Sequence, residues 1–175
     1  MFVKNMIMKK ILMFMAIMIA VVSLSSCNSF EKKAKKQMRE TINELAKNPD
    51  TYKVVNEKVV FSNDSVCVIS FVGKGENGFG GYTSNKREYY LTKRHTKDGV
   101  KVEEALLNLD DEDAHNTPFK KEVDRMYKDK DLRKTLIEEC KKQNIDFNSE
   151  EGKNVVASSL AIIITAIQGR EVDMD

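Results

Sequence analysis

The sequence is poor in the residues that mark disordered chains and many enzyme active sites. It has two prolines, no tryptophan and no low-complexity tract, which argues against an intrinsically disordered protein. Its only histidines are His95 and His115, and no serine or cysteine has a recognisable catalytic partner nearby in sequence. The residues therefore indicate no enzyme and no cofactor, although catalytic triads can assemble from distant positions.

Cysteine is scarce as well, with three residues in the whole chain. Cys67 and Cys140 each lie in an apolar pattern where a small buried thiol is common. Neither is flanked by the histidine or basic cluster of a reactive thiolate. In an oxidising compartment these two cysteines could pair. The sequence leaves open both a disulfide and two free cysteines in the core.

The third cysteine, Cys27, ends an N-terminal segment of distinct composition. Residues 1–10 carry three lysines and no acidic residue, and residues 11–24 are almost wholly apolar, an order typical of a secretory signal. The apolar run is shorter than the roughly 20 residues that a membrane-spanning helix needs. We therefore expect export and cleavage; a plain anchor helix with an incidental cysteine is the alternative.

The four residues that close this segment, Leu24, Ser25, Ser26 and Cys27, resemble the lipobox of bacterial lipoproteins. In that family the cysteine thiol is diacylated and the peptide before it is removed. The resemblance implies that Leu24, Ser25 and Ser26 are the signal-recognition residues and that Cys27 carries the lipid. Because two or more acyl chains bind a membrane stably, it also implies a mature protein that is anchored to a membrane through its N-terminal lipid.

Removal of the signal peptide, residues 1–26, changes the charge balance of the chain. The signal contains three of the 29 basic side chains and no acidic one, so 26 basic residues remain against 27 acidic residues. This balance gives no electrostatic basis for binding nucleic acid. The residues after the signal are numerous enough for one domain with a hydrophobic core.

The mature chain begins with a basic amphipathic segment, residues 27–50. We expect a helix over residues 30–47, whose apolar stripe consists of Phe30, Ala34, Met38, Ile42 and Leu45. The residue before a proline disfavours the helical conformation, so Asn48 and Pro49 should end the helix. Its early basic residues could contact anionic lipid head groups, or they form a solvated face or a short tether; they are Lys32, Lys33, Lys35, Lys36 and Arg39.

Residues 51–108 show the alternation of a β-sheet. Strands are expected at residues 51–55, 58–61 and 65–72, from about residue 82 or 87 to residue 94, and at residues 100–103. Residues 65–72 are apolar on both faces, which predicts a central strand. Short turns at residues 62–64 and 97–99 predict an antiparallel meander.

Residues 109–175 are expected to form the helical C-terminal part of the same domain. An acidic connection over residues 105–116 should lead to a helix that starts at Thr117 and Pro118, breaks near residue 129 and continues through Leu132, Leu136 and Cys140. A capping box of Asn148 and Glu151 should start the last helix, and Gly169 should end it. This helix has little polar face and is expected to be buried. The predicted fold is α+β: an N-terminal helix, an antiparallel meander sheet of three to five strands, and C-terminal helices packed on it.

Two segments are candidates for function. Residues 73–78 match G-x-G-x-x-G, but a dinucleotide site needs a helix to follow, whereas a strand follows here, so we predict a flexible hairpin loop. Phe79 and Tyr82 in this region are candidate partner-binding residues, with simple turn geometry as the alternative. Residues 110–113 with His115 lack the ligand spacing of an EF-hand, so we expect a solvated acidic loop and no metal site.

A second resemblance covers roughly residues 30–106. The motifs NPDTY at residues 48–52 and NGFGGY at residues 77–82 resemble a loosely defined group of small exported lipoproteins of Bacteroides-like bacteria. That group has no established activity, so the resemblance implies an α+β fold and a location in the cell envelope. In such bacteria, lipoproteins exported to the surface tend to carry acidic residues just after the cysteine. Residues 28–33 are basic here, which favours an outer-membrane protein that faces the periplasm.

These observations predict a lipid-anchored envelope protein with a non-enzymatic binding or structural role. The alternative is an inhibitor or immunity-type lipoprotein that binds one protein partner through residues 73–82. A third possibility, an envelope hydrolase, requires His95 or His115 beside a carboxylate or hydroxyl in a cleft. The expected partners are a membrane and an envelope protein rather than nucleic acid, and the sequence does not indicate the oligomeric state.

Overall fold

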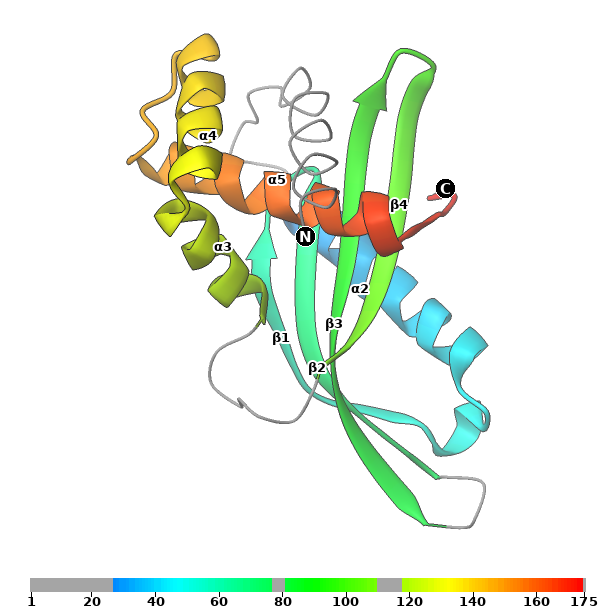
Figure 1. Cartoon of the computed structure of the whole chain (residues 1–175). Coiled ribbons are helices and arrows are strands. Elements are labelled where there is room, and N and C mark those ends of the chain that lie inside the picture. Colours follow the sequence, from blue (N-terminus) through cyan, green and yellow to red (C-terminus); the bar gives the residue numbers. More distant parts are fainter. Residues whose placement is uncertain (1–26, 77–80, 110–117, 175) are drawn as a thin grey trace.

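Four long strands follow one another as an antiparallel meander, and a short fifth strand completes the sheet (Figure 1). The computed structural model describes residues 27–76, 81–109 and 118–174. In spatial order the strands are β1 (Lys53–Ser62), β2 (Val66–Glu76), β3 (Tyr82–Thr96), β4 (Gly99–Leu109) and β5 (Arg170–Glu171). The predicted α+β class and the meander are confirmed, and the C-terminal tail adds β5 to the edge formed by β4.

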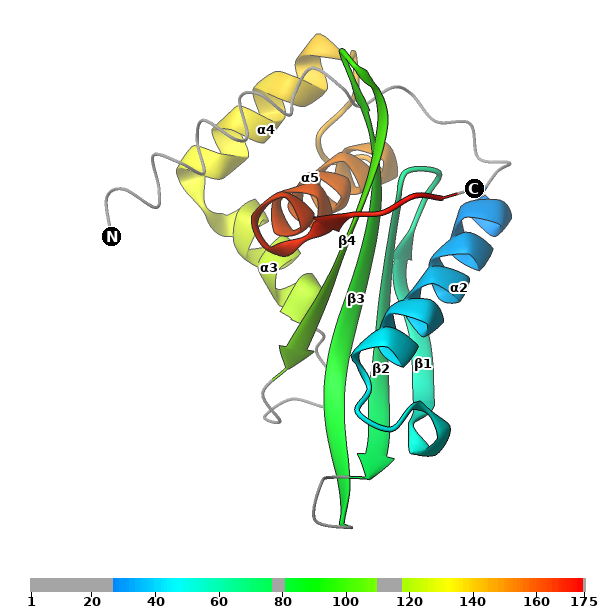
Figure 2. The ribbon, with the colours of Figure 1, turned by 90° about the vertical axis from the view of Figure 1, so that its right-hand side faces the viewer.

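Helices cover both faces of this sheet (Figure 2). The N-terminal helix α2 (Cys27–Leu45) packs on one face, and η1, a 3-10 turn (Pro49–Thr51), connects it to β1. On the other face lies α5 (Glu150–Gln168), with α3 (Pro118–Lys128) and α4 (Lys130–Lys142) beside it. No helix within the described ranges is long and apolar enough to cross a membrane.

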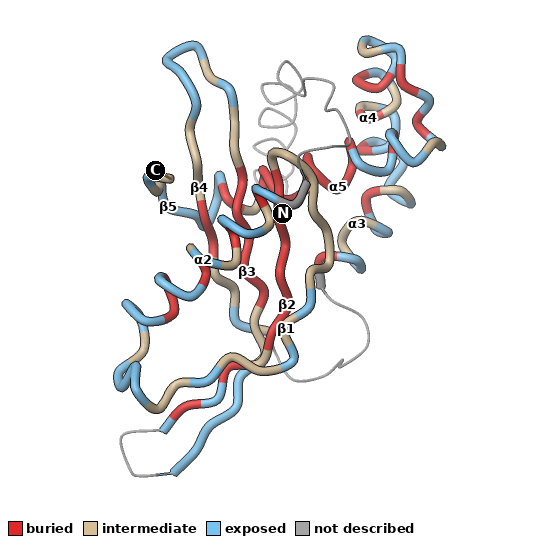
Figure 3. Tube along the Cα trace, turned by 180° about the vertical axis from the view of Figure 1, so that it is seen from behind, coloured by how far each residue is buried: buried red, intermediate tan, exposed pale blue. Residues whose placement is uncertain are grey.

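The central strand β2 explains how one sheet serves two hydrophobic cores. Val66 and Val68 face the α5 side, whereas Cys67, Ile69 and Phe71 face α2, and all five are almost completely buried. Successive side chains of a strand point to opposite faces, so a strand covered on both sides is predominantly apolar on both faces, and Ser70 is the buried polar exception in β2. The burial of β2 and β3 is visible as continuous red segments in Figure 3. The prediction of a central strand is therefore confirmed.

The positions of Cys67 and Cys140 on the two sides of the sheet show why they do not form a disulfide. Cys67 faces α2, whereas Cys140 lies in α4 on the opposite side of the sheet. Neither cysteine forms a disulfide, and both are buried. Burial is the main cause that raises the pKa of the Cys140 thiol, which keeps it protonated and unreactive.

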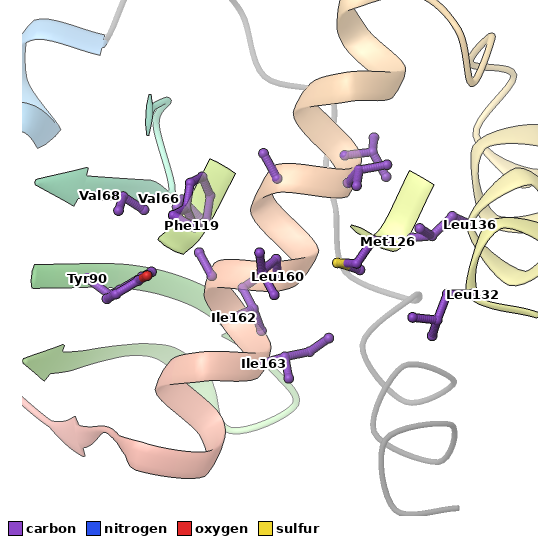
Figure 4. Packing of buried hydrophobic residues seen from close by; sticks show 14 of the residues in the cluster. Val66, Val68, Tyr90, Phe119, Met126, Leu132, Leu136, Leu160, Ile162 and Ile163 are labelled. Atoms are coloured by element: carbon purple, nitrogen blue, oxygen red, sulfur yellow. The ribbon is translucent and has the colours of Figure 1, made fainter. Parts of the chain in front are cut away.

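The larger core is built around α5, the most apolar helix of the described residues. Leu160, Ile162 and Ile163 pack in the same cluster as Val66, Val68 and Tyr90 of the sheet (Figure 4). Phe119 at the start of α3 closes this cluster through an edge-on contact with Tyr90, at 5.9 Å between ring centroids. The expected burial of the last helix is confirmed along most of its length, although Ile167 in its final turn is 59% exposed.

The boundaries of several elements differ from the sequence prediction. Leu45 is the last residue of α2 and is 59% exposed, because the end of this helix extends beyond the sheet (Figure 1). The two short strands expected at residues 51–55 and 58–61 form one strand, β1, which is interrupted by register shifts on either side of residue 58. Asn56 absorbs the first irregularity with a positive φ of 54°, which asparagine tolerates better than most residues.

The connection expected from residue 105 onward is partly strand. β4 continues to Leu109, because Ala105 and Leu107 enter the larger core and Leu106 enters the core beneath α2. The acidic residues 110–113, together with His115 and Thr117, lie outside the described residues. At the next boundary Asp129 caps α4 by accepting hydrogen bonds from the backbone N–H groups of Asp131 and Leu132, which confirms the break predicted there.

The N-cap of α5 is Ser149 and not Asn148. The Oγ of Ser149 accepts a hydrogen bond from the N–H of Gly152 at 3.1 Å. Asn148 belongs to the preceding turn, where its own N–H donates to the side chain of Asp146. The predicted end of the helix is confirmed, since Gly169 is its C-cap.

Because Tyr89 and Tyr90 are buried, we expect the free energy of unfolding to decrease at alkaline pH. Both are fully buried, on opposite faces of the sheet, and each donates its hydroxyl to a buried carboxylate, Glu104 at 2.6 Å and Glu88 at 2.7 Å. Burial, reinforced by these carboxylates, raises the pKa of both tyrosines above the ordinary value of 10.0. Above about pH 10 the unfolded chain releases both protons and the folded chain retains them, so each tyrosine should lower the free energy of unfolding by about 1.4 kcal/mol per pH unit.

A pH titration monitored by tyrosinate absorbance and circular dichroism would check this expectation. The absorbance of these two residues should appear only with loss of the native circular dichroism. Replacing either Tyr89 or Tyr90 by phenylalanine should reduce the slope of stability against pH. Complete ionisation of all tyrosines in a chain that retains native circular dichroism would contradict the prediction.

Candidate functional site

The hairpin formed by β2 and β3 projects beyond the helical layers (Figures 1 and 2). Its last described pair is Glu76 with Tyr82, whereas β4 already ends at the pair of Leu109 with Lys86. Tyr82 is 76% exposed. Its predicted companion, Phe79, lies outside the described residues. The structure therefore leaves the side chain of Tyr82 open to contact at the far end of the hairpin.

The glycines at the base of this hairpin have a packing role. Gly73 and Gly75 lie within β2, paired with Asn85 and Thr83, so the prediction of a flexible loop is wrong for these two residues. The ring of Tyr52 lies directly on them. A Cβ atom at Gly73 would be 1.7 Å from the Tyr52 hydroxyl oxygen, and one at Gly75 would be 2.9 Å from the ring atom Cδ2. Side chains at these two positions would occupy the space that Tyr52 fills.

Only part of the G-x-G-x-x-G match can be located in the fold. Gly73 to Glu76 are strand residues, and the last two positions of the motif lie outside the described residues. The next element is β3. A phosphate site of the dinucleotide type requires the N-terminus of a helix at this point, so the expectation of a hairpin is confirmed.

Arg87 lies next to Tyr52 on the same face of the sheet. It is paired with Phe71 in β2, and its guanidinium carbon is 5.9 Å from the centre of the Tyr52 ring. The Nε of Arg87 and the hydroxyl oxygen of Tyr52 are buried without a hydrogen-bond partner. No described carboxylate forms an ion pair with this arginine. We call the surface made by Tyr52, Thr83, Asn85 and Arg87 the hairpin patch.

Neither Tyr52 nor Arg87 was predicted from the sequence to be a functional residue. Tyr52 lies before β1 and far from the glycines in sequence, and its contact with them depends on the pairing of β1 with β2. The only available signal was the alternation of β3, which places Thr83, Asn85 and Arg87 on one face. That alternation does not reveal that an aromatic ring replaces the missing side chains of the glycines.

The residues considered for hydrolytic chemistry are not brought together in the described part of the chain. His95 is exposed near the end of β3, and no described carboxylate or hydroxyl forms a hydrogen bond with it. His115 lies outside the described residues. Within those residues no group of three or more histidine, cysteine, aspartate or glutamate side chains is arranged to hold a metal ion.

The basic segment at the start of the chain is a packed helix. Phe30, Ala34 and Met38 of α2 are buried against the sheet, so the predicted helix is confirmed and the alternative of a short tether is wrong from Phe30 onward. Lys35 bridges to Glu31 at 2.7 Å, a hydrogen bond that raises the lysine pKa. Lys32 and Lys33 remain exposed, one turn after Cys27.

Comparison with known proteins identifies no relative, because no family model, no curated protein and no solved structure matches this chain. The hairpin patch and the exposed Tyr82 are therefore interpreted from their own geometry.

Proposed function

We propose that this chain is a lipid-anchored protein of the bacterial cell envelope with a non-enzymatic binding or structural role. The order of basic residues, apolar run and lipobox-like residues before Cys27 supports the anchor. The basic residues after Cys27 favour attachment to the outer membrane on its periplasmic side. The projecting hairpin with Tyr82 76% exposed is the observation that carries the binding role.

The short distance between Cys27 and the folded core would determine how closely a lipid anchor holds the domain to the membrane. Cys27 is the first residue of α2, and Phe30, which is 7% exposed, already belongs to the core. Three helical residues span about 4.5 Å. Lipid on Cys27 would therefore hold the folded domain directly against the membrane, with the exposed Lys32 and Lys33 near the lipid head groups.

The same arrangement sets the direction in which the hairpin faces. In both views α2 runs from Cys27 towards the end of the molecule that carries the β2–β3 hairpin (Figures 1 and 2). A membrane at the N-terminus of α2 would thus lie away from Tyr82. The hairpin would face the aqueous compartment, where a soluble or envelope partner can reach it.

The alternative function is an inhibitor or immunity-type lipoprotein that binds a single protein partner through residues 73–82. The exposed aromatic side chain of Tyr82 favours this candidate, because aromatic residues are enriched among the energetically important residues of protein interfaces. A hydrolase remains the third candidate. It has less support, because His95 is exposed and forms no hydrogen bond or ion pair with a described carboxylate.

The anchor is tested by changing Cys27→Ser in the full chain. The variant should be released from membranes or retain its signal peptide, because serine cannot carry the thioether-linked lipid. The measurement is fractionation of cells into soluble and membrane proteins, together with the mass of the chain. Unaltered processing and membrane retention of the Cys27→Ser variant would refute the proposed anchor.

The binding role is tested by a pull-down from envelope extract with the detergent-solubilised chain. The Phe79→Ala, Tyr82→Ala double variant should lose a partner that the unmodified chain retains, whereas a Lys97→Ala variant in the other exposed turn should retain it. A partner that all three chains retain would exclude the hairpin as the contact. Capture of no partner by any of them would count against the inhibitor-type function and favour a structural role.

A further inference from the structure

Arg87 differs from most other arginines of the structure in having no carboxylate partner. Ion pairs with described carboxylates are formed by Arg39, Arg94, Arg125 and Arg170. Arg87 is half-buried, and its only described interaction is with the ring of Tyr52. A partly desolvated charge is stabilised when an opposite charge pairs with it. We propose that the hairpin patch binds a carboxylate of an acidic peptide segment, and that Arg87 forms the ion pair.

The position of the guanidinium suits this role. Tyr52 rests on Gly73 and Gly75 and supports Arg87 through its ring face. The Nε of Arg87 is buried without a partner, and no hydrogen bond or ion pair to a described residue engages its two terminal nitrogens. Terminal nitrogens of a guanidinium bind a carboxylate in a bidentate manner. Because the stacking on Tyr52 restricts the side chain, less conformational entropy would be lost on binding.

The surroundings of Arg87 favour a carboxylate over a phosphate. Arg87 carries the only charge among the four side chains of the hairpin patch, and one guanidinium matches a single negative charge. Asn85 and Thr83 are exposed beside it on the same face, and the Asn85 amide can donate a further hydrogen bond. These residues extend along β3 towards the end of the hairpin, so an extended acidic segment would lie along this face of the strand, which is opposite to the face that bears the side chain of Tyr82. This inference rests on the proposed binding role and is independent of the lipid anchor.

The test measures binding of a fluorescein-labelled hexaglutamate peptide to the detergent-solubilised full chain at low ionic strength. Arg87→Gln should weaken binding at least tenfold, and Arg87→Lys should weaken it less, because lysine retains the charge but not the bidentate geometry. Arg133→Gln is the matched control, because Arg133 also stacks on an aromatic ring, that of Phe147, at 5.7 Å. This control should bind the peptide as the unmodified chain does, and a hexaglutamine peptide should not bind.

Three results would overturn the inference. The first is that the unmodified chain does not bind hexaglutamate at millimolar concentration. The second is that the Arg87→Gln variant binds the peptide as well as the unmodified chain does. The third is that inorganic phosphate displaces the peptide at a lower concentration than acetate does. If the hairpin-dependent partner of the pull-down is retained by Arg87→Gln, this inference fails and the proposed binding role stands. Thermal melting of each variant confirms that it is folded.

Discussion

Replacing Arg170 by alanine should lower the free energy of unfolding by about 2 kcal/mol, because the change leaves a buried carboxylate without its charged partner, while the arginine itself is 52% exposed and partly screened by water. Glu104 in β4 is 2% exposed, and Arg170 donates from Nε to its Oε1 at 2.7 Å. A second bond from Arg170 reaches Glu44 of α2 at 2.9 Å. These two carboxylates hold the pKa of the guanidinium above its usual value.

The expected loss lies below the usual range for a broken buried ion pair, because Arg170 is itself 52% exposed and because Glu104 has other partners. The Thr41 hydroxyl is 2.9 and 2.8 Å from its two oxygens, and the Tyr89 hydroxyl is 2.6 Å from Oε2. The side chain of Glu104 therefore connects α2, β3, β4 and the residue that begins β5. Without Arg170, these neutral hydroxyl donors remain around a carboxylate that no charge balances.

Urea unfolding of the Arg170→Ala variant measures this effect. Lys101→Ala is the matched control, since Lys101 forms an ion pair with Glu171 on the same sheet edge, but both side chains are at least 41% exposed. This control should lose less than about 1 kcal/mol. In the Arg170→Ala background, Glu104→Gln should recover about 1 kcal/mol, because it removes the unbalanced charge. Equal, small losses for Arg170→Ala and Lys101→Ala would show that the buried pair contributes no more than the exposed one.

Met38→Ala should destabilise the domain by about 3 kcal/mol, within the range for truncation of a long core side chain. Met38 is fully buried in the cluster formed by α2 with Ile69 and Phe71 of β2 and with residues of β3. The cost follows from lost apolar contacts and from the cavity that the sheet cannot close. A loss of this size requires that α2 is part of the folded domain.

Lys36→Ala on the same helix provides the comparison. Its side chain is 76% exposed, and it pairs only with Glu40 across one turn, so the change should alter stability by less than about 0.5 kcal/mol. If both variants were equally stable, α2 would be a tether, and lipid on Cys27 would not hold the domain close to the membrane. The stability of the Met38 variant thus bears directly on the proposed arrangement at the membrane.

Much of the fold could be predicted because its elements have strong local patterns. The 3.6-residue period of Phe30, Ala34, Met38 and Ile42 defines the buried stripe of α2, and all four are buried as expected. The apolar character of β2 on both faces predicted a strand covered from both sides. Boundaries were less certain, as at Ser149, because a cap depends on which of two adjacent polar side chains reaches the free N–H group.

The candidate site was predicted only in outline. Residues 73–82 were identified as a hairpin with exposed aromatics, and Tyr82 is exposed at its end. The contacts of Tyr52 with Gly73 and with Arg87 were not predicted. They join β2 and β3 to the residue that precedes β1 and depend on register, which local sequence does not encode.

The sequence by itself determined the α+β class, the meander and the buried stripes of the helices, since each is a pattern among near neighbours in the chain. The proposal of a lipid at Cys27 rests on a pattern of the same kind. Only the tertiary structure decided that Cys67 and Cys140 lie on opposite faces, that Glu104 is balanced by Arg170, and that Tyr52 supports an unpaired Arg87. The physical reason is the same in each case. These relations join residues that are distant in sequence, and their energies depend on burial and distance, which exist only when the sheet and its two helical layers have assembled.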